Sequence, residues 1–183
     1  MTTTAQDIVS AKLERSFDAL DVNGDGYLDW SDYEKLGDRY IQAYRLDKND
    51  RRARAIVAFN QMSWLELLRH SGVDTDRLTK EQFVTANRLS AIDTSRMNMV
   101  EGGGHAIFDV IDADGDNEIG RAEFERFLRD VWRSVAPDAM ESFIRLDTDG
   151  DGAISRQEFI RALREYHFST DPDAPGSLFF GQV

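Results

Sequence analysis

The feature that most constrains this fold is a twelve-residue acidic loop that occurs three times in 183 residues. Segments 112–124 (DADGDNEIGRAEF) and 147–159 (DTDGDGAISRQEF) align without a gap, and 21–33 (DVNGDGYLDWSDY) aligns with both. In each, Asp or Asn stands at positions 1, 3 and 5, an apolar residue at position 8, and a carboxylate followed by an aromatic residue closes the unit. Three copies in register argue against ordinary surface turns, which the same residue types also form.

Apolar residues flanking the loops recur at helical spacing. Before loop one (21–32) they are Val9, Leu13, Phe17 and Leu20, and after loop three (112–123) they are Phe124, Phe127, Leu128, Val131 and Trp132. Each unit is therefore predicted to be helix, loop, helix. The segment from Ile56 to Leu68 is apolar on most faces, and we expect it to be centrally buried.

Because such units usually pair, three of them predict a fourth. Segment 71–83 (SGVDTDRLTKEQF) has the apolar position 8, Leu78, and the closing aromatic residue. Thr79 and Gln82 have the spacing of a capping box at the start of a helix. Positions 1, 3, 5 and 12 offer no carboxylate: they are Ser71, Val73, Thr75 and Gln82. Loop two (71–82) is thus predicted to bind no ion and to support loop one, with Leu78 paired to Leu28 in a short antiparallel ribbon.

The loop pattern suits calcium, a hard cation that takes about six to eight oxygens and accepts a bidentate carboxylate. Side chains at positions 1, 3 and 5, a backbone carbonyl at 7, a ligand or water at 9 and a carboxylate at 12 supply these oxygens. Position 6 needs a left-handed backbone, which glycine adopts freely and asparagine tolerates. Gly26, Asn117 and Gly152 stand there.

The candidate ligands follow from this spacing. Loop one offers Asp21, Asn23, Asp25, the carbonyl of Tyr27, Asp29 and Asp32. Loop three offers Asp112, Asp114, Asp116, the carbonyl of Glu118 and Glu123, with water expected at position 9. Loop four (147–158) offers Asp147, Asp149, Asp151, the carbonyl of Ala153, Ser155 and Glu158. The shorter arm of Asp32 predicts that site one favours Mg²⁺, or binds Ca²⁺ more weakly, relative to the other two.

The net charge of −12 belongs to these loops. Twelve of the 34 acidic residues occupy side-chain ligand positions, and the remaining 22 equal the 22 Lys and Arg residues. This balance argues against nucleic-acid binding, which needs a concentrated positive surface. The absence of cysteine, of a secretory leader and of a long apolar run predicts a cytoplasmic protein that makes no membrane contact.

The loops are identified as EF-hands, and nearly the whole chain resembles the sarcoplasmic calcium-binding proteins, of which calerythrin is the bacterial member. The resemblance rests on the silent second loop, the long insertion before it, the Asp that closes loop one, and the segment REYHF followed by a tail containing LFFG. It implies a compact all-α protein of two packed lobes, each a pair of EF-hands, with the second EF-hand degenerate and calcium at loops one, three and four.

On this basis residues 1–92 form the N-terminal pair and residues 105–168 the C-terminal pair. Segment 93–104, DTSRMNMVEGGG, is predicted to be the linker between them because its glycines suit a hinge. Residues 169–183 form a tail whose Leu178, Phe179 and Phe180 could pack into an apolar cleft left by the lobes.

The resemblance favours a monomeric buffer or transporter of Ca²⁺ and Mg²⁺. The few, scattered methionines support this reading, because a sensor usually presents a methionine-rich groove. A calcium sensor that exposes an apolar groove to a protein target remains the alternative. A third possibility is a photoprotein-like binder of an apolar ligand, whose cavity Trp30, Trp64, Trp132, Tyr166 and His167 could line, although ordinary core packing explains these residues more simply. No nucleophile or phosphate-binding motif indicates an enzyme.

Overall fold

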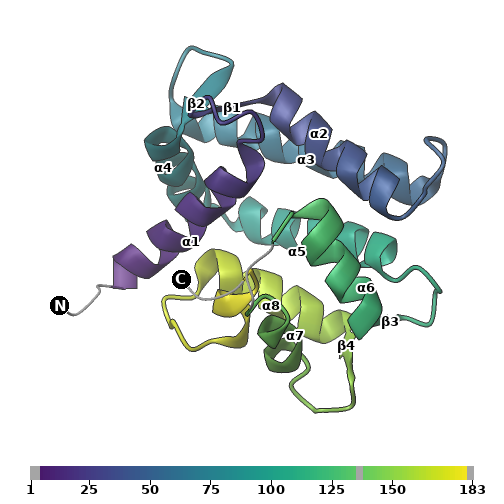
Figure 1. Cartoon of the computed structure of the whole chain (residues 1–183). Coiled ribbons are helices and arrows are strands. Elements are labelled where there is room, and N and C mark those ends of the chain that lie inside the picture. Colours follow the sequence, from purple (N-terminus) through teal and green to yellow (C-terminus); the bar gives the residue numbers. More distant parts are fainter. Residues whose placement is uncertain (1–4, 135–137, 181–183) are drawn as a thin grey trace.

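The computed structural model describes residues 5–134 and 138–180, and most of them are helical (Figure 1). The first two helix–loop–helix units comprise α1 (Ala5–Leu20), β1 (Tyr27–Asp29), α2 (Trp30–Ala43), α3 (Arg51–Ser71), β2 (Arg77–Thr79) and α4 (Lys80–Ser90). The other two comprise α5 (Thr94–Ile111), β3 (Glu118–Gly120), α6 (Arg121–Arg126), the π-helical turn η1 (Phe127–Val131), α7 (Glu141–Leu146), β4 (Ala153–Ser155) and α8 (Arg156–Phe168). A 3₁₀ turn, η2 (Pro175–Leu178), follows α8.

Short antiparallel ribbons join the units in pairs. β1 pairs with β2 so that Leu28 lies opposite Leu78, and β3 pairs with β4 so that Ile119 lies opposite Ile154. All four side chains are fully buried, so each ribbon ties the backs of two loops to the core beneath them. The predicted ribbon between loops one and two is confirmed, as is the all-α fold of two lobes that each contain a pair of units.

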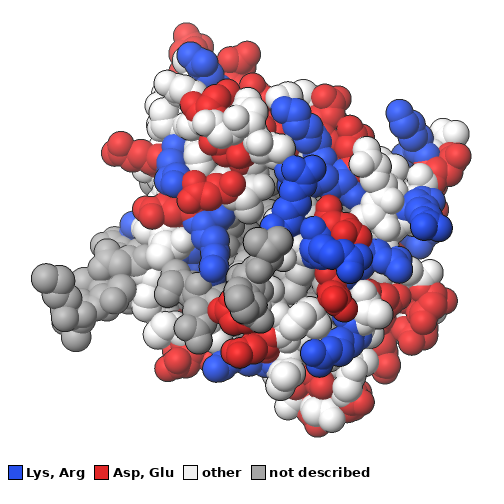
Figure 2. All heavy atoms as spheres, viewed as in Figure 1, with Lys and Arg blue, Asp and Glu red and all other residues white. Residues whose placement is uncertain are grey.

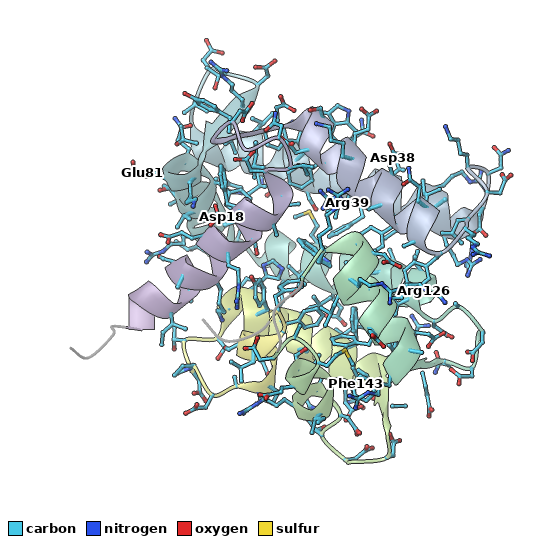
Figure 3. All side chains as sticks on the ribbon, in the orientation of Figure 1. Asp18, Asp38, Arg39, Glu81, Arg126 and Phe143 are labelled. Carbon is cyan, nitrogen blue, oxygen red and sulfur yellow. The ribbon has the colours of Figure 1, made fainter. Side chains whose placement is uncertain are left out.

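The two lobes share one apolar core. α5 packs against α3 of the first lobe and α8 of the second, while α2 packs against η1 and α1 against α8. The buried side chain of Arg39 extends from α2 toward the second lobe (Figure 3), where its Nη1 donates to the carbonyl of Val131 at 3.1 Å. The lobes are therefore docked through helix faces and through a buried hydrogen bond.

Segment 93–104 does not form the predicted linker. α5 begins at Thr94 and runs through the three glycines without a break, so the helix before loop three is much longer than expected. A Cβ on Gly103 would overlap the ring of Phe59 on α3, and a Cβ on Gly104 would lie 3.1 Å from Leu163 of α8. These glycines permit close helix packing, which outweighs the cost of about 1 kcal/mol that glycine carries in a helix.

The prediction that Ile56–Leu68 is buried on most faces is wrong along one side of α3. Ile56, Trp64 and Leu67 are buried, but Val57, Met62 and Leu65 are 43, 54 and 58% exposed. The reason is that α2, α4 and α5 cover only part of the helix circumference. An apolar sequence alone does not reveal which stripe of a helix its neighbours leave open.

The tail folds back onto the second lobe, in agreement with the expectation that its apolar residues fill a cleft. η2 packs against α7 and α8. Phe179 is fully buried, with its ring centroid 5.6 Å from that of Phe159 and 6.0 Å from those of Phe124 and Phe127. A Cβ on Gly176 would overlap the carbonyl of Ala162, so the tail backbone lies directly against α8.

A buried lysine connects the first helix to this tail. Lys12 of α1 is fully buried and donates to the carbonyls of Glu165 (3.0 Å) and Ser169 (2.7 Å) and to the hydroxyl of Ser177 (3.3 Å). Its ammonium thus satisfies carbonyls at the C-terminal end of α8, where a positive charge also suits the helix dipole.

The described residues include no helix that is both long and apolar enough to span a membrane. Figure 2 shows acidic and basic side chains interspersed over one face, and both kinds also lie on the parts that project at its edges.

Candidate metal centres

Each acidic loop begins at the last turn of a helix, which fixes the carboxylate at position 1. The backbone N–H groups of Asp21, Asp112 and Asp147 still donate to the preceding helix, at 2.8, 2.9 and 3.0 Å. Their carboxylates then accept from backbone N–H groups further along the same loop. Asp21 accepts from Gly24 and Gly26, Asp112 from Gly115 and Asn117, and Asp147 from Gly150 and Gly152, all at distances between 2.8 and 3.0 Å.

The backbone at position 6 is left-handed in all three loops, as predicted. The φ angles of Gly26, Asn117 and Gly152 are 81°, 67° and 93°. The glycines at position 4 are left-handed too, a requirement that the ligand spacing alone did not identify; they are Gly24, Gly115 and Gly150. Asn117 has a partner of its own, because Nε of Arg156 donates to its side-chain oxygen at 3.1 Å.

The carboxylates at position 5 turn each loop toward its ribbon. Asp25, Asp116 and Asp151 accept from the N–H groups two residues later, those of Tyr27, Glu118 and Ala153, at 2.9, 2.9 and 3.0 Å. The N–H of each position-7 residue is thereby engaged, and position 7 is the one from which the backbone carbonyl is the expected ligand.

The closing residue divides the loops into two kinds. In loops three and four, one carboxylate oxygen of Glu123 or Glu158 accepts from the position-9 N–H, that of Gly120 or Ser155, at 2.9 Å. The other oxygen reaches across the loop to the position-2 N–H, from Ala113 at 2.7 Å or Thr148 at 2.8 Å. This side-chain reach places the carboxylate beside the acids at positions 1 and 3.

Asp32 reaches fewer hydrogen-bond partners than Glu123 or Glu158. Its Oδ2 accepts from the position-9 N–H, that of Asp29, at 3.1 Å, but its buried Oδ1 has no hydrogen-bond partner among the described residues. The ammonium of Lys35 lies 3.9 Å from Oδ1. Burial raises the pKa of Asp32. An orphaned, buried carboxylate oxygen at this position fits a cation ligand, because an ion would supply the missing partner.

Glu158 is the opposite case. Burial alone would raise its pKa, but hydrogen bonds from Thr148 and Ser155 outweigh it and lower the pKa to about 2. Thr148 contributes both its N–H and its hydroxyl, which lies 2.6 Å from Glu158 Oε1, and Arg161 donates to the same hydroxyl. Sequence reasoning missed this role of Thr148, since position 2 is not a ligand position.

The acids of loops three and four gather as ligand clusters. One potential ligand oxygen from each of Asp112, Asp114 and Glu123 lies within 4.8 Å of the others, and the same holds for Asp147, Asp149 and Glu158. Negative charge also acts between the two loops, since Asp151 of loop four raises the pKa of Glu118 in loop three. Oxygen-only clusters of this charge suit a hard divalent cation such as Ca²⁺ or Mg²⁺.

Loop two uses its polar groups within the protein. Oε1 of Gln82 accepts from the N–H of Thr79, whose hydroxyl accepts from the N–H of Gln82, which is the predicted capping box. The hydroxyl of Ser71 donates to the carbonyl of Leu68, and that of Thr75 donates to the carbonyl of Arg77. None of the four ligand positions brings a carboxylate to this loop.

The aromatic residues considered for an internal ligand site are only partly brought together. A cavity of about 120 Å³ between the lobes is lined by Trp132, Tyr166 and His167, together with Tyr40 and other, mostly apolar residues. Trp30 instead lies in an outer groove between α2 and α3, and Trp64 packs on Tyr33 with ring centroids 5.4 Å apart. The hydroxyl of Tyr40 and the indole N–H of Trp132 are buried without a hydrogen-bond partner among the described residues.

Family comparison agrees with this geometry. Residues 105–170 match the model of an EF-hand domain pair, and residues 13–36 match that of an EF hand. The protein thus contains EF-hands, the calcium-binding helix–loop–helix unit, and the matched segments hold loops one, three and four. No curated protein sequence matches the chain.

Solved structures with a similar fold include a calcium-binding protein of Streptomyces coelicolor, 26% identical, with a TM-score of 0.73 over 89% of this chain and 99% of that one. The coelenterazine-binding protein of Renilla muelleri in its calcium-loaded apo form is 23% identical over the full length of both chains, with a TM-score of 0.74. Magnesium-loaded apo-berovin, a light-sensitive ctenophore photoprotein, is 23% identical over 85% of this chain and 86% of that one, with a TM-score of 0.68. The last two indicate a shared fold.

Proposed function

We propose that this protein is a monomeric, non-enzymatic buffer or transporter of Ca²⁺ and Mg²⁺ in the cytoplasm, with three working EF-hands. The observation that carries the proposal is the position of the tail. Phe179 occupies the apolar interior of the second lobe, among Phe124, Phe127 and Phe159. A sensor needs that kind of surface free for its target, whereas a buffer keeps it covered.

The chain's own packing holds this cover in place. Lys12 bonds to Ser177 of η2, and the N–H of Gly176 donates to Oε2 of Glu165 at 2.7 Å. Opening the lobe to a target would break these hydrogen bonds and expose Phe179. Under this proposal the protein binds ions with little change in its exposed apolar surface.

We further propose that site one exchanges Ca²⁺ for Mg²⁺ more readily than sites three and four. Asp32 does not span its loop as Glu123 and Glu158 do, and Mg²⁺ prefers shorter distances and fewer ligand oxygens than Ca²⁺. In the structurally similar apo-berovin, all three calcium-binding loops bind magnesium. At the low calcium concentration of a resting cell, Mg²⁺ would occupy site one. It would have to dissociate before Ca²⁺ could bind, which would delay calcium uptake by the buffer.

Calorimetric titration with Ca²⁺, with and without millimolar Mg²⁺, tests the stoichiometry and the exchange. Three calcium sites are expected, with Mg²⁺ weakening one of them most. A parallel titration with a dye that fluoresces on apolar surface tests the closed tail. A large rise in fluorescence with Ca²⁺ that Mg²⁺ cannot reproduce would favour a sensor, and fewer than three sites would contradict the ligand assignment.

The central cavity favours a second candidate function, the binding of a small aromatic ligand. The buried hydroxyl of Tyr40 and indole N–H of Trp132 interact with each other without forming a hydrogen bond of ordinary geometry, and a ligand acceptor atom would supply a better partner. The volume of about 120 Å³ limits the ligand to roughly one ring, because a cavity of about 150 Å³ holds benzene. A thermal shift with phenol that Trp132→Phe reduces would support this function, and unaltered melting would count against it.

A further inference from the structure

We propose that Glu66, His70 and Asp93 form a zinc site outside the EF-hand loops. One ligand atom from each of these residues lies within 4.8 Å of the others. Glu66 and His70 are one helical turn apart near the end of α3, with Oε1 of Glu66 2.8 Å from Nε2 of His70. Asp93 comes from the segment just before α5. Two distant parts of the chain therefore supply the three groups.

The chemistry of this set differs from that of the loops. Calcium and magnesium take oxygen ligands, whereas an imidazole nitrogen with carboxylates suits zinc. In a tetrahedral zinc site, ligand atoms about 2.0–2.2 Å from the metal lie roughly 3.4 Å apart. The separations here, 2.8 Å for one pair and below 4.8 Å for the rest, need only small side-chain rotations to reach that value. Water would complete the fourth position.

A positive group already lies among the three ligand atoms. Nη2 of Arg69 is 2.6 Å from Glu66 Oε1, 3.3 Å from His70 Nε2 and 3.4 Å from Asp93 Oδ2. The Arg69 side chain is 60% exposed, so it can move into water at little cost when a metal ion replaces its charge. Arg69 is therefore a competitor for the site, and its removal strengthens zinc binding.

The position of the site gives zinc a structural effect. His70 lies in the last turn of α3, directly before loop two, and Asp93 lies where the first lobe passes into the second. A shared ion would tie the end of α3 to this junction. Because zinc binds only the folded arrangement of the three groups, it raises the melting temperature of the calcium-saturated protein.

The test uses the full chain saturated with Ca²⁺, so that the loops are occupied, and titrates ZnCl₂ against a competing chelator dye. Wild-type protein is expected to bind one Zn²⁺ with a rise in melting temperature. His70→Ala is expected to weaken binding by roughly 100-fold, at least the effect of losing a residue that merely supports a ligand. Arg69→Ala is expected to tighten binding.

The matched control is His105→Ala, which removes an exposed histidine on α5 and leaves zinc binding unchanged. Asp93→Asn provides a second ligand variant at a partly exposed position, in case loss of the imidazole disturbs α3. Circular dichroism checks that each variant is folded. Zinc binding that survives in both His70→Ala and Asp93→Asn, or no binding by the wild-type protein, would overturn the proposal.

Discussion

The hydroxyl of Tyr44 donates to the backbone carbonyl of Glu123 at 3.0 Å. Tyr44 is the C-cap of α2, the helix that leaves loop one, and Glu123 is the closing residue of loop three. The guanidinium of Arg126 lies over the Tyr44 ring, 5.6 Å from its centroid. A rigid helix thus connects the exit of one metal site to the backbone of a closing ligand in the other lobe.

Tyr44→Phe is expected to weaken the thermodynamic coupling between sites one and three. The lost hydrogen bond is worth about 0.5–1.5 kcal/mol, so the coupling free energy should fall by at most that amount. A double-mutant cycle measures it: Asp21→Ala disables site one, and calcium affinity at the remaining sites is compared with and without Tyr44→Phe. Tyr27→Phe, which alters an exposed tyrosine in loop one itself, is the control. An unchanged effect of Asp21→Ala in the Tyr44→Phe background would contradict the coupling.

Asp32→Glu is expected to raise the selectivity of site one for Ca²⁺ over Mg²⁺. The longer arm can reach the position-2 N–H, as Glu123 and Glu158 do, and bring a second oxygen to the ion. A gain of roughly tenfold corresponds to about 1.4 kcal/mol, the scale of one charged hydrogen bond. Calcium titration at several Mg²⁺ concentrations measures it.

The reverse change supplies the control for site one. Glu158→Asp is expected to make site four resemble site one, with weaker Ca²⁺ binding and stronger competition by Mg²⁺. Equal selectivity in Asp32→Glu and wild type would show that arm length does not set the preference.

Neighbouring glycines of α5 are expected to respond oppositely to alanine. Gly103→Ala places a Cβ in the ring of Phe59 and should destabilise the fold by about 1–3 kcal/mol. Gly102→Ala meets nothing within 4 Å and should stabilise it by up to about 1 kcal/mol. Denaturant unfolding compares the two. Stabilisation by both variants would indicate that this part of α5 is loosely packed, as the predicted linker at residues 93–104 would be.

Phe179→Ala is expected to open the second lobe. Loss of a fully buried aromatic side chain costs about 3–5 kcal/mol, and the vacated apolar surface should bind a reporter dye even without Ca²⁺. Ile144→Ala, at a 65% exposed position on α7, should change stability by less than about 0.5 kcal/mol and leave dye binding unaltered. Equal dye binding by both variants would argue against a tail that covers the core.

Lys12 is expected to make the free energy of unfolding increase with pH in the alkaline range. Burial lowers its pKa from 10.5 to about 8, against the attraction of Glu165. Between these values the unfolded chain binds a proton that the folded protein does not, so this residue makes the free energy of unfolding rise with pH from about 8 to 10.5. The rise is at most about 3.5 kcal/mol, given about 1.4 kcal/mol per pKa unit.

Lys12→Met removes that contribution. The free energy of unfolding of the wild type minus that of the variant should therefore increase from pH 8 to 10.5 at fixed calcium. The comparison cancels the ionisation of tyrosines, which both proteins share. That matters because burial raises the pKa of Tyr166 to about 12, an effect that acts in the opposite sense above pH 10. A pH-independent difference would mean that Lys12 keeps its ordinary pKa.

The features that sequence predicted well are those fixed within one loop. Ligand spacing, the left-handed position 6 and the apolar position 8 are local requirements, so Leu28 and Leu78 could be paired before the structure was known. The features it missed depend on which helices meet. Nothing near Tyr44 indicates that its hydroxyl reaches a residue 79 positions away, and the glycines of α5 suggest a hinge until Phe59 lies against them. Local chemistry is encoded in short segments, whereas close packing is decided by the whole fold.

The bonds of Lys12 also bear on how the chain acquires its structure during synthesis. The groups that this side chain contacts lie 153 to 165 residues further along the sequence, so they leave the ribosome long after α1. Until then the ammonium group of Lys12 lacks the acceptors that its burial requires, although Phe17 of α1 can already pack on Phe83 of its own lobe. The hydrogen bonds that dock α1 onto α8 and η2 are therefore made only after the first lobe has been synthesised. Early synthesis and late docking thus coincide in one helix, α1.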